Sequence, residues 1–112
     1  MVRVMALAGL VGCGGDEVSA DGAFPRACDE STIDGDCVEY TGDGWVAADV
    51  TDNCDGGAIV PECPPTTPVG ECALDAGTEF ETITVFYTPF WNAASGVQAC
   101  AGQGGAWTAA TR

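Results

Sequence analysis

The stretch Val38-Glu39-Tyr40-Thr41 decides the fold, because a second version of it, Val85-Phe86-Tyr87-Thr88, follows later in the chain. Similar residues then follow both versions in the same order. They pair as Trp45 with Trp91, Ala47-Ala48 with Ala93-Ala94, Val50 with Val97, Cys54 with Cys100, and Gly56-Gly57 with Gly104-Gly105. Self-similarity of this kind indicates an internal duplication. We therefore expect one duplicated domain over residues 28–112, with copies at 28–62 and 63–112.

Two pairs of cysteines share one spacing, with eight residues between the members of each pair. The pairs are Cys28 with Cys37 and Cys63 with Cys72. Aligning them makes residues 73–83 an insertion in the second copy. The insertion contains the turn Asp75-Ala76-Gly77-Thr78 and therefore predicts an additional hairpin.

Each copy predicts a strand followed by a helix. The β-branched and aromatic residues from Val38 and from Val85 suit strands. Apolar residues then recur at helical spacing, as Val46, Ala47, Val50 and Cys54, and as Phe90, Ala93, Val97 and Cys100. The expected caps are Asp43 or Thr41, and Thr88 with Pro89. With returning strands at 58–63 and 106–110, the fold class is α+β: a small disulfide-rich domain with an antiparallel or mixed sheet and two short helices on one face.

The six cysteines of the domain predict three disulfides. They are Cys28, Cys37, Cys54, Cys63, Cys72 and Cys100, and they allow fifteen connectivities. A helix that folds back along its preceding strand brings Cys54 towards Cys37, and symmetry then gives Cys37–Cys54, Cys72–Cys100 and Cys28–Cys63. Zinc sites favour close Cys-x-x-Cys pairs and often use His, and the chain has neither. No metal and no cofactor are expected.

The charge balance excludes one class of partner. The 112 residues carry 3 Lys+Arg against 17 Asp+Glu, a formal net charge of −14. A protein that binds nucleic acid needs cationic side chains to neutralise phosphates, and this chain would repel a polyanion. Nucleic acid is therefore not an expected partner.

The first thirteen residues predict an export signal. A short positive start, Met1-Val2-Arg3, precedes an apolar run that ends in Leu10-Val11-Gly12-Cys13. These last four residues resemble the lipobox of bacterial lipoproteins. The resemblance implies a signal peptide at 1–12, cleavage between Gly12 and Cys13, and acylation of Cys13. Removing Cys13 from the seven cysteines leaves six, which can pair evenly.

The same resemblance implies a location. Residues 13–27 would be the lipidated N-terminus and a flexible acidic tether, which would hold the domain to a lipid bilayer. In such lipoproteins an Asp directly after the acylated Cys favours retention at the inner membrane, and here that position is Gly14. The outer membrane of a Gram-negative bacterium is the expected destination. The cysteine and Tyr-Thr pattern also resembles small, uncharacterised cysteine-rich lipoproteins of myxobacteria.

The residue types argue against catalysis. Without His or Lys, the Ser-His-Asp triad, the Cys-His dyad and Schiff-base chemistry are all impossible. A pair of carboxylates can hydrolyse a glycoside, but that mechanism needs a deep cleft that so small a chain has little mass to build. No enzyme activity and no catalytic residue are expected. The leading hypothesis is a non-enzymatic, membrane-tethered binding or structural module of the cell envelope.

Three features leave a ligand-binding alternative open, namely a calcium-assisted binder or a loop-mediated one such as a protease inhibitor. Acidic residues gather at Asp29-Glu30, Asp34-Gly35-Asp36 and Asp52-Asn53-Cys54-Asp55-Gly56, which suits calcium, although a solvated acidic surface is the simpler interpretation. The stiff segment from Cys63 to Cys72 can present a peptide, although a connector between the copies is the simpler interpretation. The aromatic residues suit a core, and any that are exposed would mark a contact face.

Overall fold

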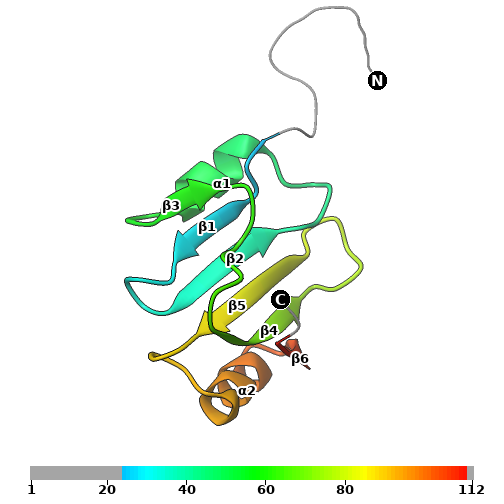
Figure 1. Cartoon of the computed structure of the whole chain (residues 1–112). Helices are drawn as coiled ribbons and strands as arrows, with labels where there is room; N and C mark the ends of the chain where they lie inside the picture. The colour runs from blue at the N-terminus through cyan, green and yellow to red at the C-terminus, as the bar shows by residue number, and fades with distance from the viewer. Residues whose placement is uncertain (1–23, 111–112) are drawn as a thin grey trace, which may run out of the picture.

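The computed structural model describes residues 24–110, which form one six-stranded sheet and two helices (Figure 1). The elements in chain order are β1 (Ala27–Glu30), β2 (Asp36–Tyr40), α1 (Ala47–Asn53), β3 (Ala58–Val60), β4 (Pro68–Leu74), β5 (Thr82–Tyr87), α2 (Ala93–Gly102) and β6 (Ala106–Ala109). The strand order is β3-β1-β2-β5-β4-β6, and all neighbours are antiparallel. The predicted α+β class is confirmed. The predicted signal, Cys13 and most of the tether lie outside the described residues.

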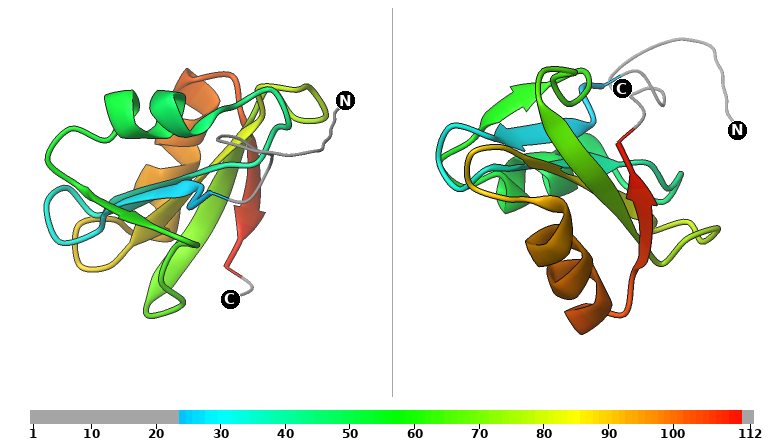
Figure 2. Two further views of the ribbon diagram at one scale, coloured as in Figure 1. Left: turned by 90° about the horizontal axis from the view of Figure 1, so that it is seen from above. Right: turned by 60° about the horizontal axis from the view of Figure 1, so that its bottom comes forward.

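The duplication is visible in the strand order. Each half of the chain is a β-β-α-β unit, and exchanging the halves exchanges β1, β2 and β3 with β4, β5 and β6. The two halves meet where β2 pairs with β5, and Val38 lies opposite Thr84 at the middle of that pairing. A pseudo-twofold axis therefore passes between these two residues, perpendicular to the sheet. It relates the two helices, which lie on the same side of the sheet (Figure 2, left).

One row of side chains crosses the whole sheet on the side that carries the helices, which we call the helix face. Directly paired residues on antiparallel strands point to the same side of a sheet. The row consists of Ile59, Cys28, Val38, Thr84, Cys72 and Trp107. Cys28 and Cys72 occupy symmetric places in it. Both helices are bonded to this row, because Cys54 after α1 and Cys100 in α2 form disulfides with these two cysteines.

The structure corrects the expected alignment of the copies. Cys28 on β1 corresponds to Cys72 on β4, not to Cys63, so the equal spacing of the two cysteine pairs is a coincidence. The hairpin expected as an insertion exists in both copies. Its turn has five residues, 31–35, in the first copy and seven, 75–81, in the second. The predicted pairs Trp45 with Trp91 and Cys54 with Cys100 agree with the symmetry. The predicted alignment of the strands is wrong by one residue, because the axis relates Val38 to Thr84 and not to Val85.

The helices begin later than expected, because local side chains bond their first turns. At α1 the Val46 N–H donates to the Asp49 carboxylate at 3.0 Å, and at α2 Asn92 and Ser95 bond each other's backbone N–H groups. The caps predicted at Asp43 or Thr41 and at Thr88 with Pro89 are therefore wrong. Within residues 24–110, neither helix has the length and apolar character that crossing a membrane requires.

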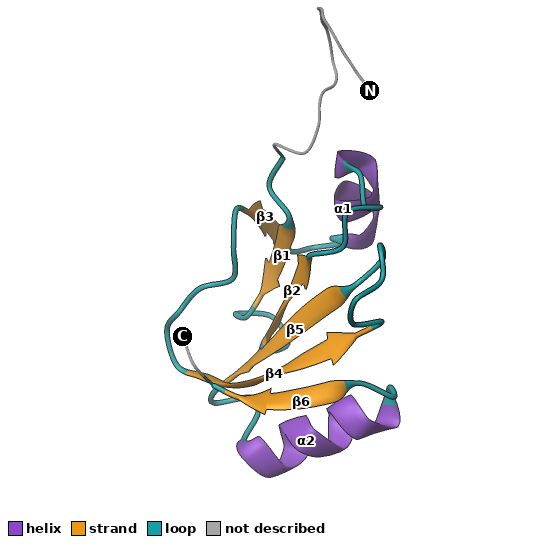
Figure 3. Ribbon diagram, turned by 90° about the vertical axis from the view of Figure 1, so that its right-hand side faces the viewer, coloured by secondary structure: helices purple, strands orange, loops and turns teal. Residues whose placement is uncertain are grey.

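The core consists of three clusters. Two lie on the helix face, one in each copy. Their buried members are Cys28, Tyr40 and Val50 in the first copy and Cys72, Phe86 and Cys100 in the second. The third cluster lies on the opposite face, which we call the back face, and contains Ala27, Cys37, Cys63, Val85 and Tyr87. Residues 61–67, here called the linker, cover this third cluster as they run from β3 to β4. Figure 3 shows the linker on the side of the sheet away from α1.

Candidate functional site

Two of the three disulfides are symmetric. Cys28–Cys54 and Cys72–Cys100 each join the second strand from a sheet edge to the end region of the helix above it. The predicted Cys72–Cys100 bridge is present. These bonds attach each short helix to its own β-hairpin, which matters because α1 has only seven residues and α2 ten. Helices of this length are marginal without tertiary contacts.

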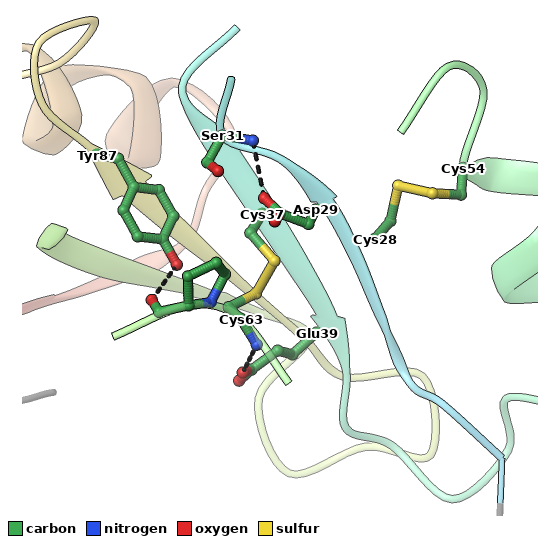
Figure 4. The surroundings of a disulfide bond; sticks show 9 residues. Cys28, Asp29, Ser31, Cys37, Glu39, Cys54, Cys63 and Tyr87 are labelled. Atoms are coloured by element: carbon green, nitrogen blue, oxygen red, sulfur yellow. Dashed lines mark hydrogen bonds between the residues drawn. A yellow bond between two sulfur atoms is a disulfide. The ribbon is translucent and has the colours of Figure 1, made fainter. Parts of the chain in front are cut away.

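The third disulfide, Cys37–Cys63, joins the linker to the back face (Figure 4). The predicted Cys37–Cys54 and Cys28–Cys63 bridges are wrong, for a reason of orientation. Side chains alternate along a strand, so Cys37 on β2 points to the back face whereas α1 lies on the helix face. Cys28 likewise points to the helix face, away from the linker. Cys54 and Cys63 therefore change places relative to the prediction, so that Cys28 bonds Cys54 and Cys37 bonds Cys63.

Further contacts hold the linker on the back face. The Tyr87 hydroxyl donates to the Pro64 carbonyl oxygen at 2.7 Å, and the Cys63 N–H donates to the Glu39 carboxylate at 2.9 Å (Figure 4). Cys63 is buried. The segment considered as an inhibitory loop, Cys63 to Cys72, is thus fixed to the sheet at its beginning and continues into β4, and its exposed residues are Pro65, Thr66 and Thr67.

Two tryptophans reach across the pseudo-twofold axis in opposite directions. Trp45, just before α1, donates its Nε1–H to the Glu81 carbonyl of the second copy at 2.9 Å. Trp91, just before α2, donates its Nε1–H to the Asp34 carbonyl of the first copy at 3.1 Å. Each indole also lies edge-on to an aromatic ring of its own copy, Tyr40 or Phe86. We call these two contacts the tryptophan clasps.

Three carboxylates meet at the turn between β1 and β2. Glu30 and Asp36 are paired across the strands, and Asp34 lies in the turn that joins them. One oxygen from each lies within 4.8 Å of the others. Sequence reasoning named Asp29-Glu30 and Asp34-Gly35-Asp36 as separate acidic clusters. It did not bring Glu30 to Asp36, because it treated residues 28–37 as a loop. The Asp34-Gly35 dipeptide, a turn signal, is the feature that could have predicted the hairpin.

The three acids influence one another's ionisation. Several effects raise the pKa of Asp36 to about 7. The largest is burial, followed by the charge of Asp34, a hydrogen bond that protonated Asp36 donates to the Asp34 side chain, and the charge of Glu30. Burial, together with the charges of Asp34 and Asp55, raises the pKa of Glu30. Like charges at this distance disfavour full ionisation. The cluster, here called the acidic triad, can therefore hold a proton near neutral pH, and its oxygens are of the type that calcium prefers.

The second copy shows what the fold itself requires at these positions. Leu74 and Thr82 are paired there as Glu30 and Asp36 are in the first copy. Gly57 and Gly105 provide a further check, since Gly57 lies against Cys28 and Glu30, and Gly105 lies against Cys72 and Leu74. The second copy therefore forms the same hairpin with apolar Leu74 and hydroxyl-bearing Thr82 at these positions. The acids are a property of the first copy and not a requirement of the sheet.

The remaining acidic residues form no further cluster of three possible ligands in the part of the chain that the structure describes. Asp29 accepts a hydrogen bond from the Ser31 N–H at 2.9 Å, which stabilises the turn after β1. Asp52 and Asp55 are exposed near the end of α1. The stretch from Asp52 to Gly56 therefore surrounds no ion-sized space with the other acids, although Asp55 is close enough to affect Glu30.

The charge distribution is a feature that sequence reasoning missed. No Asp, Glu, Lys or Arg occurs between Glu81 and Arg112. This uncharged stretch includes β5, α2 and β6. In the fold α2 and β6 form one end of the molecule, because β6 is an edge strand and α2 packs against β4 and β6, whereas β5 lies in the middle of the sheet. A plot of charge against position would have revealed the asymmetry.

Comparison with known proteins adds no relative: no protein-family model matches the chain, and neither a curated protein nor a solved structure has significant similarity to it.

Proposed function

We propose that this chain is a bacterial lipoprotein whose disulfide-braced domain acts as a non-enzymatic binding or structural module of the cell envelope. The supporting observation is the pairing of the cysteines. The six that lie within residues 24–110 form three disulfides, and the only remaining cysteine in the sequence is Cys13. Structural disulfides are typical of exported proteins. Cys13 follows an apolar segment and completes the lipobox-like Leu10-Val11-Gly12-Cys13.

The proposal assigns a recognition or scaffolding role because the chain has no imidazole or lysine amine to activate a hydroxyl nucleophile. The sequence contains no His and no Lys. The acidic triad places three acids together on one strand pair and its turn, whereas glycoside hydrolysis needs two acids on opposite sides of a bound sugar. A disulfide-braced sheet instead offers a rigid surface, which lowers the entropy lost on binding.

The lipid anchor would hold the domain at the outer membrane, because Gly14 follows the acylated cysteine. The substitution Gly14→Asp tests this part separately. In a Gram-negative host, the wild-type protein should fractionate with outer membranes and the Gly14→Asp protein with inner membranes. Equal fractionation of both proteins with inner membranes would refute the outer-membrane location while leaving the anchor itself in place.

The main test is the intact mass of the full chain extracted from membranes with detergent, with and without alkylation in the absence of reductant. We expect a chain that begins at Cys13, carries acyl groups and takes up no alkylating agent. Cys13→Ser is the matched control, and it should leave the membrane fraction and gain no acyl mass. An unlipidated wild-type chain that begins at Met1 would overturn the proposal.

Two further assays decide between this proposal and the ligand-binding alternative. A calcium-dependent rise in melting temperature that is lost in Asp34→Asn would replace the proposal with a calcium-assisted binder. Inhibition of a protease in a panel, abolished by substitutions at Pro65 and Thr66, would replace it with a loop-mediated inhibitor. We expect neither effect, because exposed carboxylates are common without ions and the linker is already fixed to the sheet.

A further inference from the structure

The two edges of the sheet differ in their protection against pairing with another strand. β3 has three residues, follows Asp55 and is itself followed by Pro61-Glu62. Short length, proline and charge are the usual devices that keep an edge strand unpaired. β6, at the other edge, is Ala106-Trp107-Thr108-Ala109, and it has neither a charge nor a proline in it or next to it. Among residues 24–110, nothing pairs with the outer edge of β6, which is therefore open to strand pairing.

The surface beside β6 is also uncharged. α2 packs against β6, and the whole stretch from β5 to β6 lacks Asp, Glu, Lys and Arg. One large apolar side chain of α2, Val97, is exposed by 42%, whereas Phe90, exposed by 53%, lies against Gly35 in the β1–β2 turn of the first copy. Phe90, Val97 and Cys100 were expected to lie in the core stripe of the second helix, and the structure buries Cys100 together with Gly96 but leaves Phe90 and Val97 exposed. The acid that pairs directly with β6 is Glu71 on β4, whose strand partner is Thr108 on the back face.

We propose that β6 pairs with β6 of a second copy of this chain, antiparallel about a twofold axis, so that two sheets join into one. About a twofold axis both copies contribute the same strand, and the assembly is complete with two copies. The chain already joins its two β-β-α-β units in this way, by the antiparallel pairing of β2 with β5. Pairing at β6 repeats that arrangement between molecules, with one α2 from each copy on the same face beside the new contact.

Charge identifies the second copy as the occupant. A net charge of −14 makes most approaches between two copies repulsive. In the β6 contact two neutral surfaces meet, and the acidic first copies of the duplication lie at the two far ends. Strands are spaced by about 4.8 Å, so the two Glu71 residues would be three spacings, or about 14 Å, apart. The Debye length is about 8 Å at physiological salt, so their repulsion is largely screened.

The test is sedimentation equilibrium of the oxidised full chain carrying Cys13→Ser, which removes the lipid and therefore the need for detergent. We expect a reversible monomer–dimer equilibrium with no larger species. Thr108→Lys places like charges on the paired edge and should raise the dimer dissociation constant by at least about tenfold. Thr108 is exposed on β6, so this substitution leaves the core intact. Ala58→Lys, also exposed but on β3, is the matched control and should leave the constant unchanged.

Three outcomes overturn the inference. The first is a monomer up to millimolar concentration. The second is a dimer that Thr108→Lys leaves intact while Ala58→Lys disrupts it. The third is open-ended growth, which would indicate head-to-tail pairing of β6 with β3. Equal disulfide content and circular dichroism spectra in the variants show that the fold is retained. All of these results are independent of whether Cys13 is lipidated.

Discussion

Trp107 shows how a single side chain constrains two glycines. Its indole ring lies on the helix face and approaches Gly70 on β4 and Gly96 on α2 so closely that a Cβ atom at either position would collide with it. The ring is therefore held between a strand and a helix. Because it is confined on both sides, it cannot move aside from a new methyl group at Gly96.

The substitution Gly96→Ala should destabilise the protein by about 1–3 kcal/mol, the usual range for overpacking, even though alanine favours helices. Gly102→Ala is the matched control at the end of the same helix, where an added Cβ would touch nothing. It should leave the free energy of unfolding unchanged or raise it slightly. Urea unfolding of both variants checks this, and an unaltered stability of Gly96→Ala would show that Trp107 is free to move.

The acidic triad gives a prediction about pH. Asp36 has a folded-state pKa of about 7, above its usual value of 3.8. Between these two values the folded protein holds a proton that the unfolded chain releases, so stability falls as pH rises from about 4 to about 7. Asp36→Asn removes this penalty, and the amide can donate to Asp34 in place of the shared proton.

We therefore expect Asp36→Asn to raise the melting temperature at pH 8 and to change it much less at pH 4. Asp43→Asn removes the same charge from an exposed position outside the triad and is the matched control. Thermal unfolding of the three proteins across this range is the measurement. Parallel melting curves for wild type and Asp36→Asn at every pH would contradict the assignment of the raised pKa to Asp36.

At the scale of elements, the tryptophan clasps connect each helix start to the hairpin turn of the other copy. Trp45→Phe and Trp91→Phe should each lower the free energy of unfolding by about 1–2 kcal/mol, because each loses one hydrogen bond and part of a packed ring. Val97→Thr, at an exposed site on α2, should have no such effect. Urea unfolding measures all three, and a clasp variant as stable as Val97→Thr would mean that the indole contacts contribute nothing to joining the copies.

The linker depends on a different element, the Cys37–Cys63 disulfide. The sequence separations of the bonded cysteines are 26, 26 and 28 residues, so loop entropy predicts similar losses of about 2–4 kcal/mol on removing any one bridge. Local effects should differ. Replacing Cys37 and Cys63 by Ala frees the linker, and a glutamate-specific protease should then cut after Glu62.

The matched control replaces Cys28 and Cys54 by Ala, which releases α1 but leaves the linker fixed through Cys63 and Pro64. Its cleavage after Glu62 should stay slow under native conditions. Equal cleavage rates in the two variants would indicate that both open by global unfolding and that the linker is not held locally.

The elements themselves were largely predictable from local patterns, and their connections were not. The Trp45 and Trp91 alignment, the fold class and the Cys72–Cys100 bridge follow from repeated residue types. The Cys28–Cys54 and Cys37–Cys63 bridges depend on which face of a strand each cysteine occupies. Because side chains alternate between the faces of a strand, and no hairpin was predicted over residues 27–40, the faces of Cys28 and Cys37 were not assigned and the partners were exchanged. The acidic triad was missed for the same reason, since it exists only once Glu30 is paired with Asp36.

At the scale of the whole molecule, charge is distributed unevenly, with all 17 acidic residues between Asp16 and Glu81. Within residues 24–110 the single basic residue is Arg26, and its guanidinium bonds the Tyr40 and Gly42 carbonyl oxygens rather than a carboxylate. Repulsion among the acids therefore has little compensation and opposes the compact state. Salt should reduce this repulsion, because it screens exposed charges.

We expect 0.5 M NaCl to raise the melting temperature at pH 8 by roughly 2–5 °C relative to low salt. The gain should be nearly the same in Asp36→Asn, because the dominant cause of the raised Asp36 pKa is burial, which salt does not screen. Thermal unfolding at two salt concentrations and two pH values separates the repulsion among the exposed acids from the cost of ionising the partly buried Asp36. If Asp36→Asn lost most of the salt response, the charges of the acidic triad, and not the distributed acids, would be the main source of the repulsion.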